Sequence, residues 1–135
     1  MTTDPSVVRS VAVHAEDLLA ALEADARGEA ETVLRMTPPF SGRMRARLHV
    51  VQDGPEEGTV HLSPTLLVDD VPPYPTPDRT ADELREAAAD YSVDRHHTYH
   101  EQRVTDWRDR LLDHVVESLH LSDFGREINV AVLGP

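Results

Sequence analysis

A nine-residue segment near the middle of the chain limits the folds that are open to it. The segment Arg43–Val51 reads RMRARLHVV, in which basic and apolar side chains alternate. Successive side chains of a β-strand point to opposite faces, so the pattern predicts a strand with one basic face and one apolar face. We therefore expect a sheet that has one buried face and one face toward water.

Other segments predict the neighbours of this strand. Residues 31–36 are rich in β-forming side chains and are expected to form a hairpin with it through a turn at residues 38–42. A second turn is predicted at Asp53-Gly54-Pro55. Further strands are predicted at three places, residues 58–62, 65–68 and 127–133. The sequential strands form an antiparallel meander, which the last strand joins.

The N-terminal region carries the signals of a long helix. Asp4 is a favourable N-cap, Pro5 suits the first helical position, and Gly28 suits the position after the last turn. Apolar residues three and four apart form a stripe from Val8 to Leu22. We therefore expect a helix over this whole stretch that packs on the core.

The second half of the chain predicts two more helices. Residues 71–78 contain four prolines in eight positions and predict an extended connection at the surface. A capping box at residues 80–83 predicts a short helix to about Ala89. A second long helix follows, and its apolar stripe reaches Leu119. Three residues are acceptable as its N-cap: Ser92, Asp94 and Thr98.

Together these elements predict a single α+β domain over residues 1–135. A mainly antiparallel sheet of four or five strands packs one face against the two long helices. The chain is long enough to bury a core, and the absence of cysteine excludes disulfides and cysteine-ligated metals. No apolar run is long enough to cross a bilayer and no signal peptide is visible, so we expect a cytoplasmic protein that does not act at a membrane.

The charge balance is strongly acidic, with 25 acidic residues, 13 basic ones and a net charge of −12. All the basic residues are arginine. Self-repulsion of this size destabilises a compact state in dilute buffer, but the screening length falls to about 3 Å at 1 M salt. In composition, though in no motif, the chain resembles small conserved cytosolic proteins of halophilic archaea. The resemblance implies a habitat and no catalytic residues. An acidic protein from a GC-rich bacterium is the alternative.

One region departs from this acidic background. Residues 32–52 contain no acid and four arginines, namely Arg35, Arg43, Arg45 and Arg47. Three of them lie on one face of the predicted strand, about 6.6–7 Å apart. Guanidinium groups bind phosphates and carboxylates through paired hydrogen bonds, so this face predicts a surface for an anionic ligand or partner. Two alternatives are open. Acidic side chains nearby pair with the arginines, or the acidic face of a helix covers them.

A histidine cluster is the second candidate site. Residues 94–100 read DRHHTYH, and in a helix His96 and His100 lie on one face at the spacing by which two imidazoles share a zinc or nickel ion. His97 lies about 100° away around the helix, so one metal ion does not easily use all three. The alternative is a helix start that is simply rich in histidine.

The common templates of catalysis are absent, because the chain has no P-loop, no dinucleotide-binding glycine pattern and no nucleophile elbow. We therefore predict a small non-catalytic binding or regulatory protein without a cofactor, which uses its arginines for an anionic partner or ligand. Nucleic acid is not expected as that partner, because most of the chain would repel it. The alternative is a divalent-metal-binding protein or metal-dependent enzyme centred on His96 and His100. The polar sheet face also leaves a homo-oligomer open.

Overall fold

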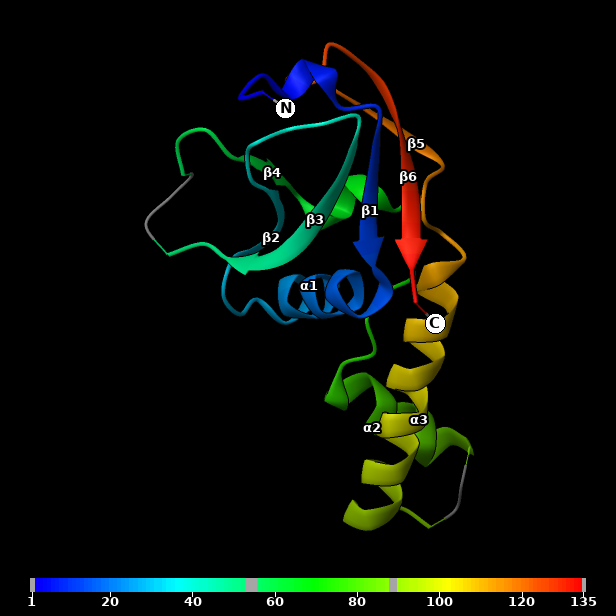
Figure 1. The fold of residues 1–135 in the computed structure, drawn as a ribbon. Coiled ribbons are helices and arrows are strands. Elements are labelled where there is room, and N and C mark those ends of the chain that lie inside the picture. Colours follow the sequence, from blue (N-terminus) through cyan, green and yellow to red (C-terminus); the bar gives the residue numbers. More distant parts are fainter. Residues whose placement is uncertain (1, 53–55, 88–89, 135) are drawn as a thin grey trace. The chain divides into compact units, whose positions relative to one another are not determined.

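The computed structural model describes residues 2–52, 56–87 and 90–134 (Figure 1). The chain divides into two compact units. Residues 1–69 and 115–135 form the first, called here the sheet unit, and residues 70–114 form the second, the helical unit. The predicted turn at residues 53–55 lies outside the described residues. Among the described residues, no helix is long and apolar enough to cross a membrane.

The sheet unit contains a six-stranded mixed sheet with the strand order β4-β2-β3-β1-β6-β5. Strand β1 lies between β3 and β6 and is parallel to both, whereas the other neighbouring pairs are antiparallel (Figure 1). The strands are β1 (Ser10–His14), β2 (Thr32–Met36), β3 (Arg43–Val50), β4 (Val60–Leu62), β5 (Ser118–Leu121) and β6 (Arg126–Leu133). The α+β class is thus confirmed, while the sheet has more strands than predicted and is not mainly a meander.

The start of the predicted N-terminal helix is wrong. Residues Ser10–His14 form β1, and helix α1 occupies only Ala15–Arg27. Val11 and Val13 are fully buried, so the segment follows the two-residue period of a strand. The favourable cap at Asp4 is used by a 3₁₀ turn, where its carboxylate accepts a hydrogen bond from the Ser6 amide at 3.0 Å. The β-branched valines fit the centre of a sheet better than a helix.

Helix α1 begins at a histidine and ends as predicted. The Nδ1 of His14 accepts a hydrogen bond from the amide of Glu16 at 3.2 Å. Gly28 takes the left-handed conformation at the other end, with φ of 67°. The helix packs against β1, β2 and β3 and buries Leu18, Leu19 and Leu22. The covered face of the sheet is therefore the one that carries the apolar alternation of β1 and β3.

Two other predicted elements are corrected in the sheet unit. Residues 64–67 form a 3₁₀ helix in place of the predicted fourth strand, because Pro64 sits at its start. The second long helix ends at Leu112, and Ser118–Leu121 form β5. Leu119, which is expected on the helical stripe, instead pairs with Ile128 of β6. The predicted turn around Gly125 joins these two strands.

The helical unit consists of α2 (Pro77–Ala87) and α3 (Val93–Leu112), which pack on each other. Ser92 is the N-cap of α3, and its hydroxyl accepts a hydrogen bond from the Arg95 amide at 3.1 Å. The short helix begins three residues before the predicted capping box, so Thr80 lies inside α2. The two long helices were predicted to share the sheet; α1 packs in the sheet unit, and α3 packs with α2 in the helical unit. A single domain over residues 1–135 stays a prediction.

Candidate functional site

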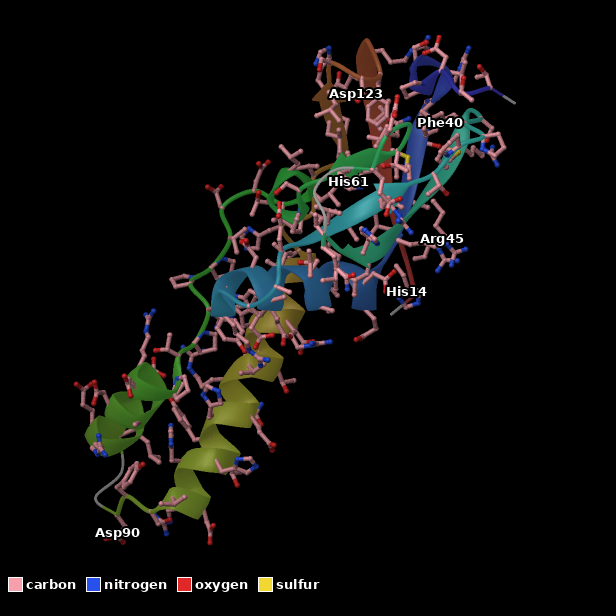
Figure 2. All side chains as sticks on the ribbon, turned by 90° about the vertical axis from the view of Figure 1, so that its left-hand side faces the viewer. His14, Phe40, Arg45, His61, Asp90 and Asp123 are labelled. Carbon is pink, nitrogen blue, oxygen red and sulfur yellow. The ribbon has the colours of Figure 1, made fainter. Side chains whose placement is uncertain are left out.

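The predicted alternation of β3 is present along most of the strand. Arg43, Arg45 and Arg47 are exposed, whereas Ala46 between them is fully buried. Figure 2 shows Arg45 pointing away from the sheet. The apolar side chains become more exposed toward the end of the strand, where Leu48 is 37% exposed. The reason is that β1 pairs with β3 only as far as Ala46, so the sheet is narrower beyond that residue.

A side chain of helix α1 bonds to the edge of β3 beyond the last residue that pairs with β1. The carboxylate of Asp17 accepts a hydrogen bond from the amide of Leu48 at 3.3 Å. This contact satisfies a backbone donor that has no strand beside it. Beyond Ala46, β3 is therefore paired with β2 on one side and accepts support from a side chain of α1 on the other.

The fourth predicted arginine lies on the neighbouring strand. Arg35 of β2 stands directly opposite Arg47 in the antiparallel register of β2 and β3. Residues paired in this way project from the same face, with Cβ atoms about 5 Å apart, and like charges in such pairs destabilise a sheet. The structure thus places all four predicted arginines on two adjacent strands. We call Arg35, Arg43, Arg45 and Arg47 the arginine face.

The four arginines differ in their partners. The Nη1 of Arg35 lies 2.8 Å from Oε1 of Glu56, and Nε2 of His49 lies 3.4 Å from the same oxygen. Within the part of the chain that the structure describes, the side chains of Arg43, Arg45 and Arg47 form no ion pair and no hydrogen bond. The predicted alternative of pairing with nearby acids therefore holds for Arg35, and not for the three arginines of β3 among the described residues.

One neighbour of the arginine face was not singled out from the sequence. His61 of β4 stands opposite Arg35, and its ring lies 5.7 Å from that of His49. Its Nε2 atom is buried and has no hydrogen-bond partner among the described residues. Sequence spacing carries no signal for this group, because only the pairing of β4 with β2 brings His61 beside Arg35. A buried polar atom without a partner is uncommon in folded proteins.

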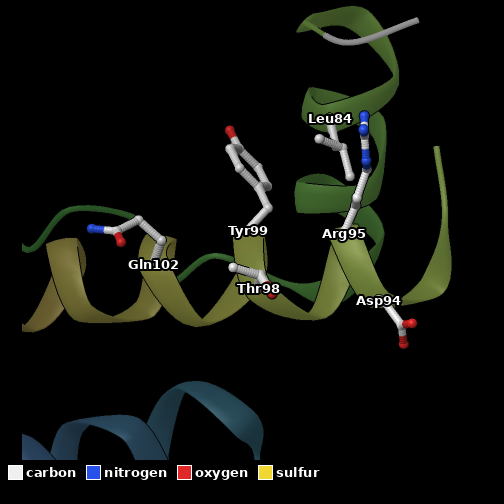
Figure 3. Close-up of a pocket in the computed structure, with 6 residues that line it drawn as sticks. All are labelled: Leu84, Asp94, Arg95, Thr98, Tyr99 and Gln102. Atoms are coloured by element: carbon white, nitrogen blue, oxygen red, sulfur yellow. The ribbon is translucent and has the colours of Figure 1, made fainter. Parts of the chain in front are cut away.

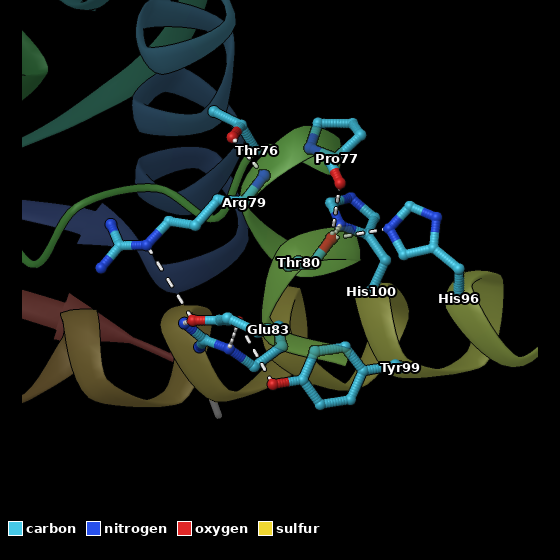
Figure 4. A network of polar contacts seen from close by, with 9 residues as sticks. Thr76, Pro77, Arg79, Thr80, Glu83, His96, Tyr99 and His100 are labelled. Atoms are coloured by element: carbon cyan, nitrogen blue, oxygen red, sulfur yellow. Dashed lines mark hydrogen bonds and ion pairs between the residues drawn. The ribbon is translucent and has the colours of Figure 1, made fainter. Parts of the chain in front are cut away.

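The two histidines of the predicted metal site lie together, but they contact a third residue. The rings of His96 and His100 are 5.9 Å apart, and Nε2 of His96 and Nδ1 of His100 each lie 2.9 Å from the hydroxyl of Thr80 (Figure 4). That hydroxyl is also 3.1 Å from the carbonyl oxygen of Pro77. A hydroxyl has one proton, and a carbonyl can only accept. All three contacts are satisfied when Thr80 donates to Pro77 and both imidazoles donate to Thr80.

This arrangement bears on the metal hypothesis. A nitrogen that donates a hydrogen bond carries a proton and does not ligate a metal ion, so a shared ion would have to bind the other ring nitrogens, Nδ1 of His96 and Nε2 of His100. Among residues 2–52, 56–87 and 90–134, no group of three or more histidines and carboxylates is arranged to hold a metal ion. His97 instead lies 3.1 Å from Glu101 of the next turn, on the separate face that the sequence predicts for it. Metal binding by His96 and His100 stays a prediction.

A second polar cluster of α2 and α3 centres on Glu83. Its two carboxylate oxygens accept hydrogen bonds from Nε and Nη2 of Arg103 at 2.9 and 3.2 Å, and the hydroxyl of Tyr99 donates to it at 3.2 Å (Figure 4). The bonds from Arg103 hold the pKa of Glu83 below its usual value, although burial acts in the opposite direction. Burial and the Glu83 carboxylate raise the pKa of Tyr99, so the phenol remains a donor.

The helical unit also has a cavity of about 540 Å³ beside this cluster (Figure 3). Leu84 of α2 and five residues of α3 line it: Asp94, Arg95, Thr98, Tyr99 and Gln102. Its size is that of a site for a small organic molecule. Its lining includes no pair of acid and base that would indicate a reaction, and the sequence pattern does not mark it, because the cavity needs both helices.

Comparison with known proteins adds the family. A family model described as a domain of unknown function, DUF8009, matches residues 1–134. The chain belongs to this family. No curated protein matches the chain, and no solved structure matches it.

Proposed function

We propose that this DUF8009 protein is a non-catalytic binding protein whose arginine face docks an acidic, extended segment of a partner protein. The observation that supports this most is the set of three exposed arginines on β3 without an ion pair among the described residues. In a chain with 25 acidic residues and 13 basic ones, unpaired arginines at consecutive outward positions are unexpected. Arg35 and Arg47 also stand opposite each other in the sheet, and a bound anion would lessen the repulsion between their charges.

The dimensions of the arginine face favour an extended ligand. Outward residues of β3 are spaced about 6.6–7 Å apart, so Arg43 and Arg47 are separated by roughly 13 Å. A single small anion would contact only part of this length. An extended peptide has the same spacing between alternate side chains, so glutamates at every second position would each meet one guanidinium group.

A binding measurement tests the proposal. A fluorescently labelled ten-residue peptide with glutamate and serine in alternation is titrated with the full chain, and anisotropy is recorded at several KCl concentrations. We expect binding that weakens as KCl rises, because the contacts are exposed and screened by salt. The double variant Arg45→Gln/Arg47→Gln should bind several-fold more weakly, since an exposed ion pair contributes about 0.2–1 kcal/mol.

The control variant removes the same charge elsewhere in the sheet unit. Arg9 and Arg126 are exposed and lie outside β2 and β3, so Arg9→Gln/Arg126→Gln should bind the peptide nearly as well as the wild type. Equal losses in the two double variants would mean that net charge alone drives binding, and the proposal would be wrong. Binding of single-stranded oligonucleotides in preference to the peptide would also contradict it.

The metal alternative is tested separately by elemental analysis of protein purified without a histidine tag. One zinc or nickel ion per chain that is lost in His96→Ala would make the metal-binding function the better proposal. Protein without bound metal after incubation with Zn²⁺ or Ni²⁺ would remove it.

A further inference from the structure

The helical unit contains a small cavity lined by arginines, and it shares no residue with the arginine face. Its volume is about 120 Å³, and six residues line it: Pro72, Pro73, Arg79, Arg103, Trp107 and Arg110. A water molecule occupies about 30 Å³ in the liquid, so the cavity has room for roughly four. It therefore suits one group of the size of a phosphate and is too small for the organic ligands that occupy 300–1,000 Å³.

The walls of this cavity are fixed by specific contacts. The Nε1 of Trp107 donates a hydrogen bond of 2.8 Å to the carbonyl oxygen of Pro72. The ring of Tyr74 meets the Trp107 ring edge to face, with centroids 4.9 Å apart. Trp107 is only 3% exposed. The proline-rich segment, which the sequence predicts to be an extended connection at the surface, thus forms one wall of the cavity and fixes the Trp107 ring through a hydrogen bond.

The charges around the cavity are unbalanced. Glu83 binds Arg103 through Nε and Nη2, which leaves the donors of Nη1 unused by that pair. The Nε of Arg79 is 3.9 Å from the same carboxylate. The side chain of Arg110 has no ion pair or hydrogen bond within the described residues. Arg79 and Arg103 therefore share one carboxylate, Arg110 has none among the described residues, and no acid lines the cavity itself.

We propose that this cavity binds a single phosphate group, with Arg79, Arg103 and Arg110 as its ligands. A phosphate carries about −1.5 to −2 charges at neutral pH and presents several acceptor oxygens. The surplus of two positive charges matches it, and Glu83 orients the guanidinium plane of Arg103 toward a defined geometry. The site does not depend on the acidic partner proposed for the arginine face.

Tryptophan fluorescence reports on the site directly, because Trp107 lines the cavity and is the only tryptophan of the chain. The full chain is titrated with inorganic phosphate while KCl keeps the ionic strength constant. We expect a saturable change in emission. In Arg110→Gln the midpoint should rise at least fivefold, whereas thermal unfolding should stay as in the wild type, since Arg110 has no partner to lose among the described residues.

Two controls make the result specific. Arg108→Gln removes one charge from the same helix outside the cavity lining and should titrate like the wild type. The double variant Arg45→Gln/Arg47→Gln should also titrate like the wild type, which separates this site from the arginine face. A phosphate response that is absent, that does not saturate, or that weakens equally in Arg108→Gln and Arg110→Gln overturns the proposal.

A parallel titration with O-phosphoserine identifies the source of the phosphate group. A lower midpoint for phosphoserine than for inorganic phosphate assigns the cavity to a phosphate that is carried on a larger molecule. An equal or higher midpoint assigns it to the free ion. Absence of a response to both compounds contradicts the site itself.

Discussion

Arg103 of the helical unit and two arginines of the sheet unit, Arg45 and Arg47, differ in how their charges are balanced. Arg103 lies between α2 and α3 with both carboxylate oxygens of Glu83 as acceptors. Arg45 and Arg47 of β3 are exposed, and their side chains have no partner within the described ranges 2–52, 56–87 and 90–134. The comparison separates charges that hold elements together from charges that are available to a ligand.

The difference follows from how much apolar surface each region buries. The sheet unit buries large side chains that include Phe40, Leu34 and Ile128. Helices α2 and α3 contribute few such residues, and the described buried residues on them are Thr80, Ala81, Leu84, Trp107 and Leu111. Polar contacts therefore carry more of the packing of α2 on α3. The packing of the sheet unit does not depend on the outward arginines of β3.

The largest expected effect comes from Thr80→Val. The change keeps the shape of this fully buried side chain but leaves two imidazole donors and the Pro77 carbonyl without their shared hydroxyl. Buried groups that lose a partner cost about 1–3 kcal/mol each, and the partly exposed imidazoles recover some of this through water, so we expect a loss of about 2 kcal/mol. Urea unfolding followed by circular dichroism measures this loss of stability.

The control is Thr105→Val, which changes an exposed threonine of α3 and should alter stability by less than about 0.5 kcal/mol. An equal loss in the two variants would refute the network around Thr80.

A smaller effect is expected for Glu83→Gln. The pair with Arg103 is about a quarter exposed on both sides, so we expect a loss of about 1 kcal/mol at pH 7. Because Arg103 lowers the pKa of Glu83 in the folded state, its contribution is present above the unfolded pKa, near 4.3, and is lost as the pH falls through the lowered folded pKa. Unfolding curves of both proteins should therefore converge below about pH 4. A difference that stays constant down to pH 2 would contradict the assignment.

The smallest effect is expected for Arg45→Gln/Arg47→Gln, whose stability should lie within about 0.5 kcal/mol of the wild type. No described ion pair is lost, and the positive charge of Arg47 opposite Arg35 is removed. Thermal unfolding in the absence of any ligand gives the comparison. A marked loss of stability would show that these arginines have a structural partner, and the arginine face would then resemble the cluster around Glu83.

Local features of the sequence predicted most of the individual elements. The alternation of β3, the strand at β6 and the left-handed Gly28 depend on neighbouring residues and are present, whereas the structure chose Ser92 among three acceptable caps of α3. Asp4 and Pro5 do begin a helical segment, but it is a short 3₁₀ turn and not the long helix that was predicted. In the candidate site, the four arginines share two adjacent strands as the alternation implied, whereas His61 and the cavity at Trp107 were not predicted.

The sequence by itself determined which faces are basic, apolar or capped, because those properties repeat with the two-residue period of a strand or the period of a helix. Tertiary structure alone decided that Ser10–His14 is a central strand, since its partners in β3 and β6 are remote in the chain. It also decided which arginines are neutralised. Whether a carboxylate reaches a guanidinium group depends on strand pairing and helix packing, which bring together residues that are remote in the chain, such as Arg35 and Glu56.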